Sequence, residues 1–310
     1  MMHLKFYLGL SSFILSAIAI VLNFLIFLPV FRMAFVSKKS SVYIIAFFNV
    51  ISDVIQLLIV CFYLSICIMM DKYFLTESQT STLNIVIGWI FINAWYMESL
   101  VQIVMAVNRF CIITLNMYHI FTYRFTIVIF ILLVFFTSLL ATLTQYIFPC
   151  CQFVAEHIVL AWMFLNPNSQ YNFSYTMLVS FDILCTVSSS VCYASVFLTL
   201  RNSYKEMADI KGQHSSQEKK DMKYLVQFVF ISVFYVFTWI CFEIFPHVVP
   251  ADKLEFFWII TLLVIMNSSS NSVIFLVCNK EIQKSIRTPW TTYVAAESRV
   301  STVASKSIVA

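Results

Sequence analysis

Long apolar runs, separated by short polar segments, follow one another along the chain. Seven of these runs hold few or no charged residues: Phe6–Phe31, Val42–Met70, Leu83–Phe110, Phe125–Cys151, Tyr175–Leu200, Tyr224–Val249 and Phe256–Val277. A helix needs about 20 residues to cross the hydrocarbon core of a bilayer, and each run is long enough. The runs lack the short apolar–polar alternation of membrane barrel strands. The pattern predicts an all-α membrane protein, a seven-transmembrane helix bundle within residues 1–287.

Composition and charge placement agree with this prediction and give it an orientation. Hydrophobic residues make up 61% of the chain and charged residues 11%, too few charges for a soluble surface. All but three of the 19 Lys and Arg residues fall in the segments between alternate runs or in the C-terminal tail; the exceptions are Lys5, Lys72 and Lys253. Basic loops stay in the cytoplasm, so we expect the N-terminus outside and the C-terminus inside. The first run is long and ends in a basic flank, which favours a retained anchor helix over a cleaved signal peptide.

The C-terminal segment divides into two parts. Between residues 279 and 287, Ile282 and Ile286 lie on one side of a helix and Lys280, Lys284 and Arg287 on the other. This amphipathic pattern predicts a short helix on the membrane surface. Residues 288–310 are rich in Ser and Thr without periodicity, which predicts a disordered cytoplasmic tail.

Polar residues at membrane depth mark a candidate network. The residues expected to form it are Asn23, Asp53, Glu98, Gln102, Asn267 and Asn271. Spacings of three and four put the members from one run on one helix face. They could simply join helices by hydrogen bonds. The buried acids Asp53 and Glu98 need a cation or a proton, and the sequence leaves both hydrated Na⁺ and protonation open.

Aromatic and acidic residues in the expected outer half mark a candidate ligand pocket. They are Phe91, Trp95, Asp182, Trp239, Glu243 and Trp258. Ligand pockets are mostly apolar with few polar anchors, although each aromatic residue could equally serve plain packing. The set predicts a small, apolar or weakly basic ligand. No residue pattern indicates a cofactor.

A short motif carries a family resemblance. The stretch Asn108-Arg109-Phe110-Cys111, followed by Ile120 and Phe121, resembles the inner end of helix 3 in nematode chemosensory receptors of serpentine receptor class x. The stretch 271–275 (Asn-Ser-Val-Ile-Phe) looks like a degenerate rhodopsin-like helix 7 motif. The resemblance implies a G-protein-coupled chemosensory receptor in the plasma membrane, often of sensory cilia, with a heterotrimeric G protein as partner. It implies that Asn108 and Arg109 form the G-protein switch; taken alone, Arg109 could be a snorkelling helix-end residue.

The chain departs from the broader receptor pattern at several positions. Asn108 stands where an acid is usual, and Phe91 where amine receptors carry Asp, so an amine ligand anchored there is not expected. The usual Cys at the outer end of helix 3 is missing. Cys150 or Cys151 is instead a candidate partner for Cys67.

Further features bound the function. Asn172-Phe173-Ser174 is a glycosylation sequon. A polytopic ion channel or transporter is the alternative function, weakened by the low Gly content and the lack of an internal repeat. The five His residues show no metal-ligand spacing, so we expect no enzyme. The expected partners are membrane lipid, a small-molecule ligand and a heterotrimeric G protein, with no nucleic acid.

Overall fold

The computed structural model describes residues 2–75, 78–117, 119–148, 150–165, 172–209, 233, 235–245, 247–250 and 253–287. The α-helices are α1 (Met2–Phe31), α2 (Ser41–Ile59), α3 (Ser65–Met70), α4 (Thr82–Arg109), α5 (Tyr123–Thr142), α6 (Phe173–Asp209), α8 (Trp258–Cys278) and α9 (Lys280–Arg287). Four π-helical turns are η1 (Arg32–Val36), η2 (Val60–Leu64), η3 (Phe110–Thr114) and η4 (Leu143–Ile147), and η5 (Leu254–Phe257) is a 3-10 turn. The strands are β1 (Phe153–Glu156) and β2 (Ala161–Phe164).

Six helices of the described chain are long and apolar enough to cross a membrane. They coincide with six of the seven predicted runs. The remaining run, Tyr224–Val249, falls partly outside the described residues, and its described part holds an apolar helix over Tyr235–Phe245. The fourth run is shorter than predicted: the helix ends with η4 at Ile147, and Phe148 is extended, so Cys151 lies beyond it.

Local sequence explains where several helices begin. The side chains of Ser40, Ser81 and Thr122 accept hydrogen bonds from backbone N–H groups in the first turns of α2, α4 and α5. Asn279 does the same for α9, where its Oδ1 accepts from Glu281 and Ile282. Short polar side chains at these positions satisfy N–H groups that have no partner within the helix.

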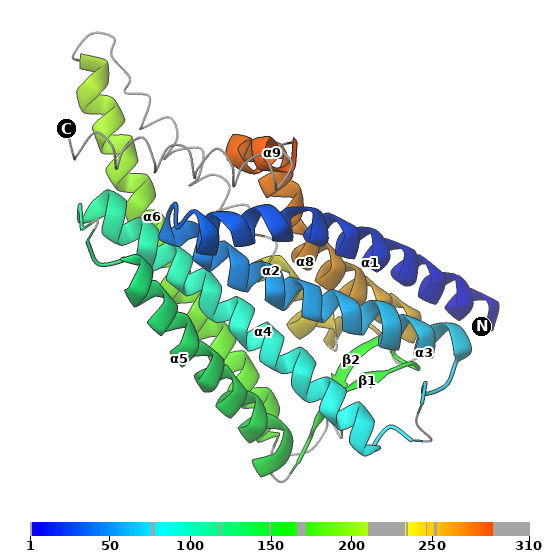
Figure 1. Ribbon diagram of the computed structural model, residues 1–310. Helices are drawn as coiled ribbons and strands as arrows, with labels where there is room; N and C mark the ends of the chain where they lie inside the picture. Colours follow the sequence, from blue (N-terminus) through cyan, green and yellow to red (C-terminus); the bar gives the residue numbers. More distant parts are fainter. Residues whose placement is uncertain are drawn as a thin grey trace.

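Helix α4 lies inside the bundle. It packs against α2, α5 and α6, while α1 packs against α2 and α8 (Figure 1). Sixteen of the 28 residues of α4 are buried, whereas α5 buries only four of 20, and many large apolar side chains of α5 are exposed. A surface of this kind is suited to lipid acyl chains.

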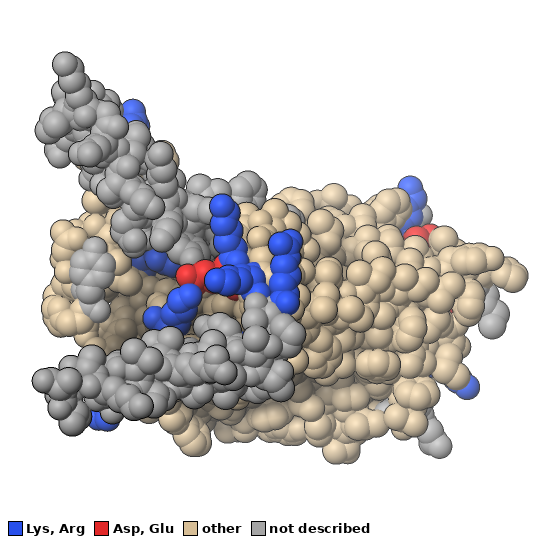
Figure 2. Space-filling model, turned by 45° about the horizontal axis from the view of Figure 1, so that its top comes forward, with Lys and Arg blue, Asp and Glu red and all other residues tan. Residues whose placement is uncertain are grey.

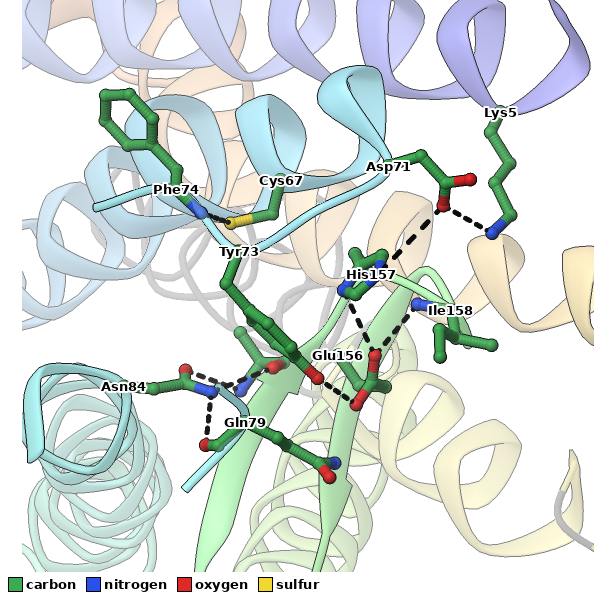
Figure 3. A network of polar contacts seen from close by, with 11 residues as sticks. Lys5, Cys67, Asp71, Tyr73, Phe74, Gln79, Asn84, Glu156, His157 and Ile158 are labelled. Carbon is green, nitrogen blue, oxygen red and sulfur yellow. Dashed lines mark hydrogen bonds and ion pairs between the residues drawn. The ribbon is translucent and has the colours of Figure 1, made fainter. Parts of the chain in front are cut away.

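The two ends of the bundle differ in structure. At one end, called here the hairpin end, antiparallel strands β1 and β2 pair Phe153 with Phe164 and Glu156 with Ala161. The hairpin packs on α4 and α8. Lys5, near the N-terminus, forms an ion pair with Asp71 at this end, with 2.6 Å between Nζ and Oδ1 (Figure 3). The pattern of apolar and polar residues does not predict this hairpin.

The opposite end, called here the α9 end, carries a cluster of basic side chains (Figure 2). Lys39 forms an ion pair with Glu281 of α9 at 2.9 Å between Nζ and Oε1. The Tyr43 hydroxyl donates to Oε2 of the same carboxylate at 2.5 Å. Glu281 thereby ties α9 to the start of α2. A helix was predicted over these residues; its position on a membrane surface stays a prediction.

The disulfide prediction is wrong in its pairing. Cys150 and Cys151 are bonded to each other. Cys67 is a free thiol, and its Sγ accepts a hydrogen bond from the backbone N–H of Phe74 at 3.2 Å. The end of α3 is therefore closed by a local hydrogen bond rather than by a link to the segment after α5.

Candidate functional site

A cavity lies under the hairpin, between α4, α6, α8 and the helix Tyr235–Phe245. Its lining residues are Phe91, Ile92, Trp95, Phe153, Trp162, Leu178, Asp182, Thr238, Phe242, Ile260 and Val264. The cavity volume that the centres of water molecules can occupy is about 30 Å³. Only a few waters or a very small molecule fit without side-chain movement. Aromatic and aliphatic groups form most of the wall, which suits an apolar ligand.

Asp182 of α6 is the only acidic group on the described part of this wall, and it is fully buried. The indole N–H of Trp95 donates to its Oδ2 at 3.1 Å and to its Oδ1 at 3.3 Å. The hydroxyl of Tyr235 donates to Oδ1 at 2.8 Å, and Ser99 donates to the same oxygen at 3.4 Å. These donors are all neutral, so they hold the carboxylate in place without cancelling a negative charge. The carboxylate can therefore accept a hydrogen bond or bind a cationic group.

The hairpin supplies two aromatic walls of the cavity. The ring of Trp162 stacks on Phe91 with 4.2 Å between ring centroids, and it is nearly parallel to the ring of Phe153 at 5.6 Å. Phe153 also contacts Phe242, at 6.2 Å. A flat aromatic or aliphatic group fits such a wall. The hairpin is therefore part of the site.

Three of the six residues predicted for the pocket, Trp239, Glu243 and Trp258, are absent from the cavity wall. Trp258 faces α1, where its indole N–H donates to Ser12 Oγ at 2.7 Å. Glu243 accepts a hydrogen bond from the hydroxyl of Tyr175 on α6. Trp239 packs against the core at the hairpin end. The position of these three residues in the sequence indicates their depth in the bundle. It does not indicate that their side chains face neighbouring helices instead of the cavity.

A second cluster, the polar core, lies deeper in the bundle and joins α1, α2, α4 and α8. Gln56 and Asn267 donate to the two oxygens of Glu98, at 2.8 Å and 2.6 Å. Asn49 and Asn271 donate to Oδ2 of Asp53, at 3.3 Å and 2.8 Å. All these side chains are buried. The structure therefore brings together residues from spans that the sequence analysis grouped.

The other predicted members of the network lie nearby. Asn23 of α1 donates from Nδ2 to the carbonyl oxygens of Ala19 and of Ser268 in α8, both at 3.0 Å. Gln102 is buried one turn beyond Glu98 on α4. Buried oxygens within this region accept no hydrogen bond from the described residues: Asn23 Oδ1, Asn49 Oδ1, Asp53 Oδ1, Gln56 Oε1 and Asn267 Oδ1. Oxygens of this kind are the ligands of hard cations and of bound water.

Arg109 and Asn108 end α4 on the side of the bundle away from the hairpin. Both are buried, Arg109 with 5% of its surface exposed. The side-chain amide of Asn108 makes no hydrogen bond with the described residues. A charged group and an unpaired amide therefore lie under the surface where α4 continues into η3.

Asn172, the sequon residue, caps α6. Its Oδ1 accepts a hydrogen bond from the N–H of Tyr175 at 2.9 Å. Glycosylation of Asn172 stays a prediction.

Sequence reasoning missed several residues of the site. Ser99 and Tyr235 were not recognised as partners of Asp182, although Ser99 follows Trp95 by one turn. Phe153 and Trp162 were missed because they belong to the unexpected hairpin.

Comparisons with known proteins agree with this architecture. A family model described as "Serpentine type 7TM GPCR chemoreceptor Srx" matches residues 13–279. Squid rhodopsin is a structural neighbour with a TM-score of 0.74, at 14% sequence identity, over 96% of this chain and 88% of that one. No curated protein matches. At this identity the rhodopsin comparison shows the fold alone: a seven-transmembrane helix bundle.

Proposed function

The chain belongs to the serpentine-type seven-transmembrane chemoreceptor family Srx, a family of G-protein-coupled receptors, and from this membership we propose that it binds an external small molecule in the cavity under the hairpin and activates a heterotrimeric G protein. The observation that carries the proposal is an apolar cavity with one buried carboxylate, Asp182, at the hairpin end. We propose a receptor role without catalysis, since the family and the fold are those of receptors.

The ligand class follows from the cavity wall. Stacked Phe91 and Trp162 favour an apolar or aromatic body, and Asp182 favours one hydrogen-bond donor or a weakly basic nitrogen. The small free volume restricts a ligand to a compact molecule unless the hairpin moves. We therefore propose a small, apolar or weakly basic compound.

We propose that this cavity faces the outside of the cell. The basic cluster at the α9 end (Figure 2) supports a cytoplasmic location for that end by the positive-inside rule, and the hairpin and the N-terminus would then lie outside. The plasma membrane, and by family likeness a sensory cilium, is the proposed location. Epitope tags on the two chain ends, stained on intact cells, test the topology; two tags on the same side would contradict it.

The switch is proposed at Arg109 and Asn108. Both are buried next to the end of α4 that faces the cytoplasm in this orientation. Opening of the bundle at that end would expose the guanidinium group to the G protein. The unpaired Asn108 in place of an acid gives Arg109 no ionic lock from its chain neighbour.

The polar core is proposed to hold hydrated Na⁺. The site has two carboxylates, Asp53 and Glu98, and several buried oxygens without a hydrogen-bond donor. A proton on one carboxyl group would satisfy only one of these oxygens, whereas a cation with bound water satisfies several. Asp53 Oδ1 and the amide oxygens of Asn49 and Asn267 would hold it.

A ligand screen with a G-protein activation readout tests the receptor function. Cells expressing the wild type should respond to at least one small apolar or weakly basic compound. The Arg109→Ala variant, matched for surface expression, should lose the response while it still binds the compound. A ligand-evoked current that persists without G proteins would instead favour a channel.

A further inference from the structure

The hairpin forms part of the cavity wall, yet no disulfide of the described chain ties it to a helix. Cys150 and Cys151 bond to each other as neighbours and cross-link no two elements. The other seven cysteines are free thiols. The hairpin must therefore be held by non-covalent contacts.

Strand β1 has one open edge. It pairs with β2 on one side, and backbone groups point alternately to the two edges of a strand. The N–H and C=O groups of Phe153 and Ala155 therefore point to the same edge. In the described structure, no third strand pairs with that edge. Unpaired backbone groups buried in a protein are costly, so side chains have to satisfy them.

Asn84 of α4 satisfies Ala155. Its Nδ2 donates to the Ala155 carbonyl oxygen at 3.2 Å, and its Oδ1 accepts from the Ala155 N–H at 3.3 Å (Figure 3). The same Nδ2 also donates to the carbonyl oxygen of Gln79 at 2.9 Å. The side chain is fully buried. One side-chain amide thus satisfies both the N–H and the C=O of Ala155, as a residue of a neighbouring strand would.

Gln145 of η4 repeats this arrangement at Phe153. Its Oε1 accepts from the Phe153 N–H at 2.6 Å, and its Nε2 donates to the Phe153 carbonyl oxygen at 2.8 Å. Nε2 also donates to the carbonyl oxygen of Ile85 on α4 at 3.0 Å. Gln145 is fully buried, and its hydrogen bonds join η4 to both α4 and β1.

Other contacts fix the rest of the hairpin. Thr261 of α8 donates to the Leu160 carbonyl oxygen in the turn at 2.8 Å. Near that turn, the Glu156 carboxylate accepts from the Tyr73 hydroxyl at 2.5 Å and from the Ile158 N–H at 3.0 Å (Figure 3). Burial and this hydrogen bond raise the pKa of Tyr73, so its proton stays available for the contact. These contacts hold the turn, while Asn84 and Gln145 hold the strand next to the cavity.

We propose that Asn84 and Gln145 are positioning residues that clamp the hairpin over the ligand cavity, in the role that a disulfide to helix α4 would otherwise have. The cover of the cavity is then independent of redox conditions. Ligand binding in this cavity rests on the proposed function, whereas the clamp on the hairpin does not depend on it.

Hydrogen–deuterium exchange of the full-length receptor in lipid nanodiscs tests the clamp without a ligand. In the wild type, a strong reductant such as a trialkylphosphine should leave the exchange of peptide 152–165 unchanged. Faster exchange after reduction would mean that a disulfide holds the hairpin, and the proposal would fall. This arm needs no variant, so it does not depend on whether any variant folds.

The second arm uses substitutions. Asn84→Ala combined with Gln145→Ala should raise exchange in the hairpin at least about tenfold, because all four hydrogen bonds from these side chains to β1 are lost. Exchange in α2 should stay as in the wild type. Asn93→Ala is the matched control: Asn93 lies on the same helix and donates to Ser138 of α5 at 3.1 Å, away from the hairpin. Wild-type hairpin exchange in the double variant would overturn the proposal, and a failed ligand screen would leave both arms unaffected.

Discussion

Replacement of Gly88 by Ala should push the hairpin away from α4. An ideal Cβ at this position would lie 2.0 Å from the Phe153 carbonyl oxygen and 2.8 Å from Gln145 Nε2. A carbon–oxygen contact normally needs roughly 3.3 Å, so β1 would have to withdraw by about 1.3 Å. That shift stretches both bonds between Phe153 and Gln145, now 2.6 Å and 2.8 Å, beyond hydrogen-bonding distance.

The magnitude depends on two opposing effects. Ala favours a helix over Gly by about 0.8–1.0 kcal/mol, which would stabilise α4. The loss of two buried hydrogen bonds costs about 0.5–1.5 kcal/mol each, and a backbone group left buried without a partner costs about 1–3 kcal/mol more. The net effect is a destabilisation of about 1–5 kcal/mol, which corresponds to a fall in Tm of about 2–8 °C for a chain of this length.

Thermal unfolding of the purified receptor in nanodiscs measures this change, and hydrogen–deuterium exchange locates it. Gly9→Ala is the matched control, because its Cβ would meet Met69 of α3 instead, at 2.7 Å from Cγ and 2.8 Å from the backbone N. That variant should also lose stability but keep wild-type exchange in the hairpin. A Gly88→Ala receptor as stable as the wild type, with unchanged hairpin exchange, would refute the close approach of α4 and β1.

Three further outcomes follow from the contacts described. Asp182→Asn should lower the potency of a weakly basic ligand at least about tenfold in a dose–response assay, whereas Glu243→Gln, which lies off the cavity wall, should leave it unchanged. The Tm of the wild type should rise when NaCl replaces choline chloride, and Asp53→Asn should abolish this rise; an equal rise in the variant would place Na⁺ elsewhere. Lys39→Met should shift Tm by less than about 3 °C, because its ion pair with Glu281 joins side chains that are 45% and 41% exposed; a larger fall would show that this pair holds the α9 end together.

The helical part of the fold could be predicted from the sequence because each apolar run is long and holds few or no charged residues. Each span is a run of apolar residues of bilayer length. Several spans follow a capping residue, such as Ser81 before α4 and Thr122 before α5. The grouping of Asp53 and Glu98 with the amides of α8 was also accessible, since polar groups at membrane depth must face one another.

The hairpin could not be predicted in the same way. Its strands have only four residues each, and their burial comes from α4 and α8 rather than from any pattern of their own. Asn84 and Gln145 look like ordinary polar residues near span ends. Their role depends on the open edge of β1, which is a tertiary contact. Trp258 and Glu243 lie off the cavity wall for a related reason: depth in a span does not fix which neighbouring helix a side chain faces.

One buried face of α4 carries nearly every element of the candidate mechanism. In order along the helix, it holds Asn84 at the hairpin, Phe91 and Trp95 at the cavity, Glu98 in the polar core and Arg109 at the far end. Because α4 is one uninterrupted helix over these residues, a ligand that moves Trp95 against Asp182 cannot leave Glu98 and Arg109 in their resting positions unless the helix bends. Signal transfer in the proposed receptor would therefore need no chain of separate side-chain contacts. Under the proposed function, a small rotation or shift of α4, opposed at one end by the hairpin clamp and in the middle by the amides on Glu98, would link the two ends.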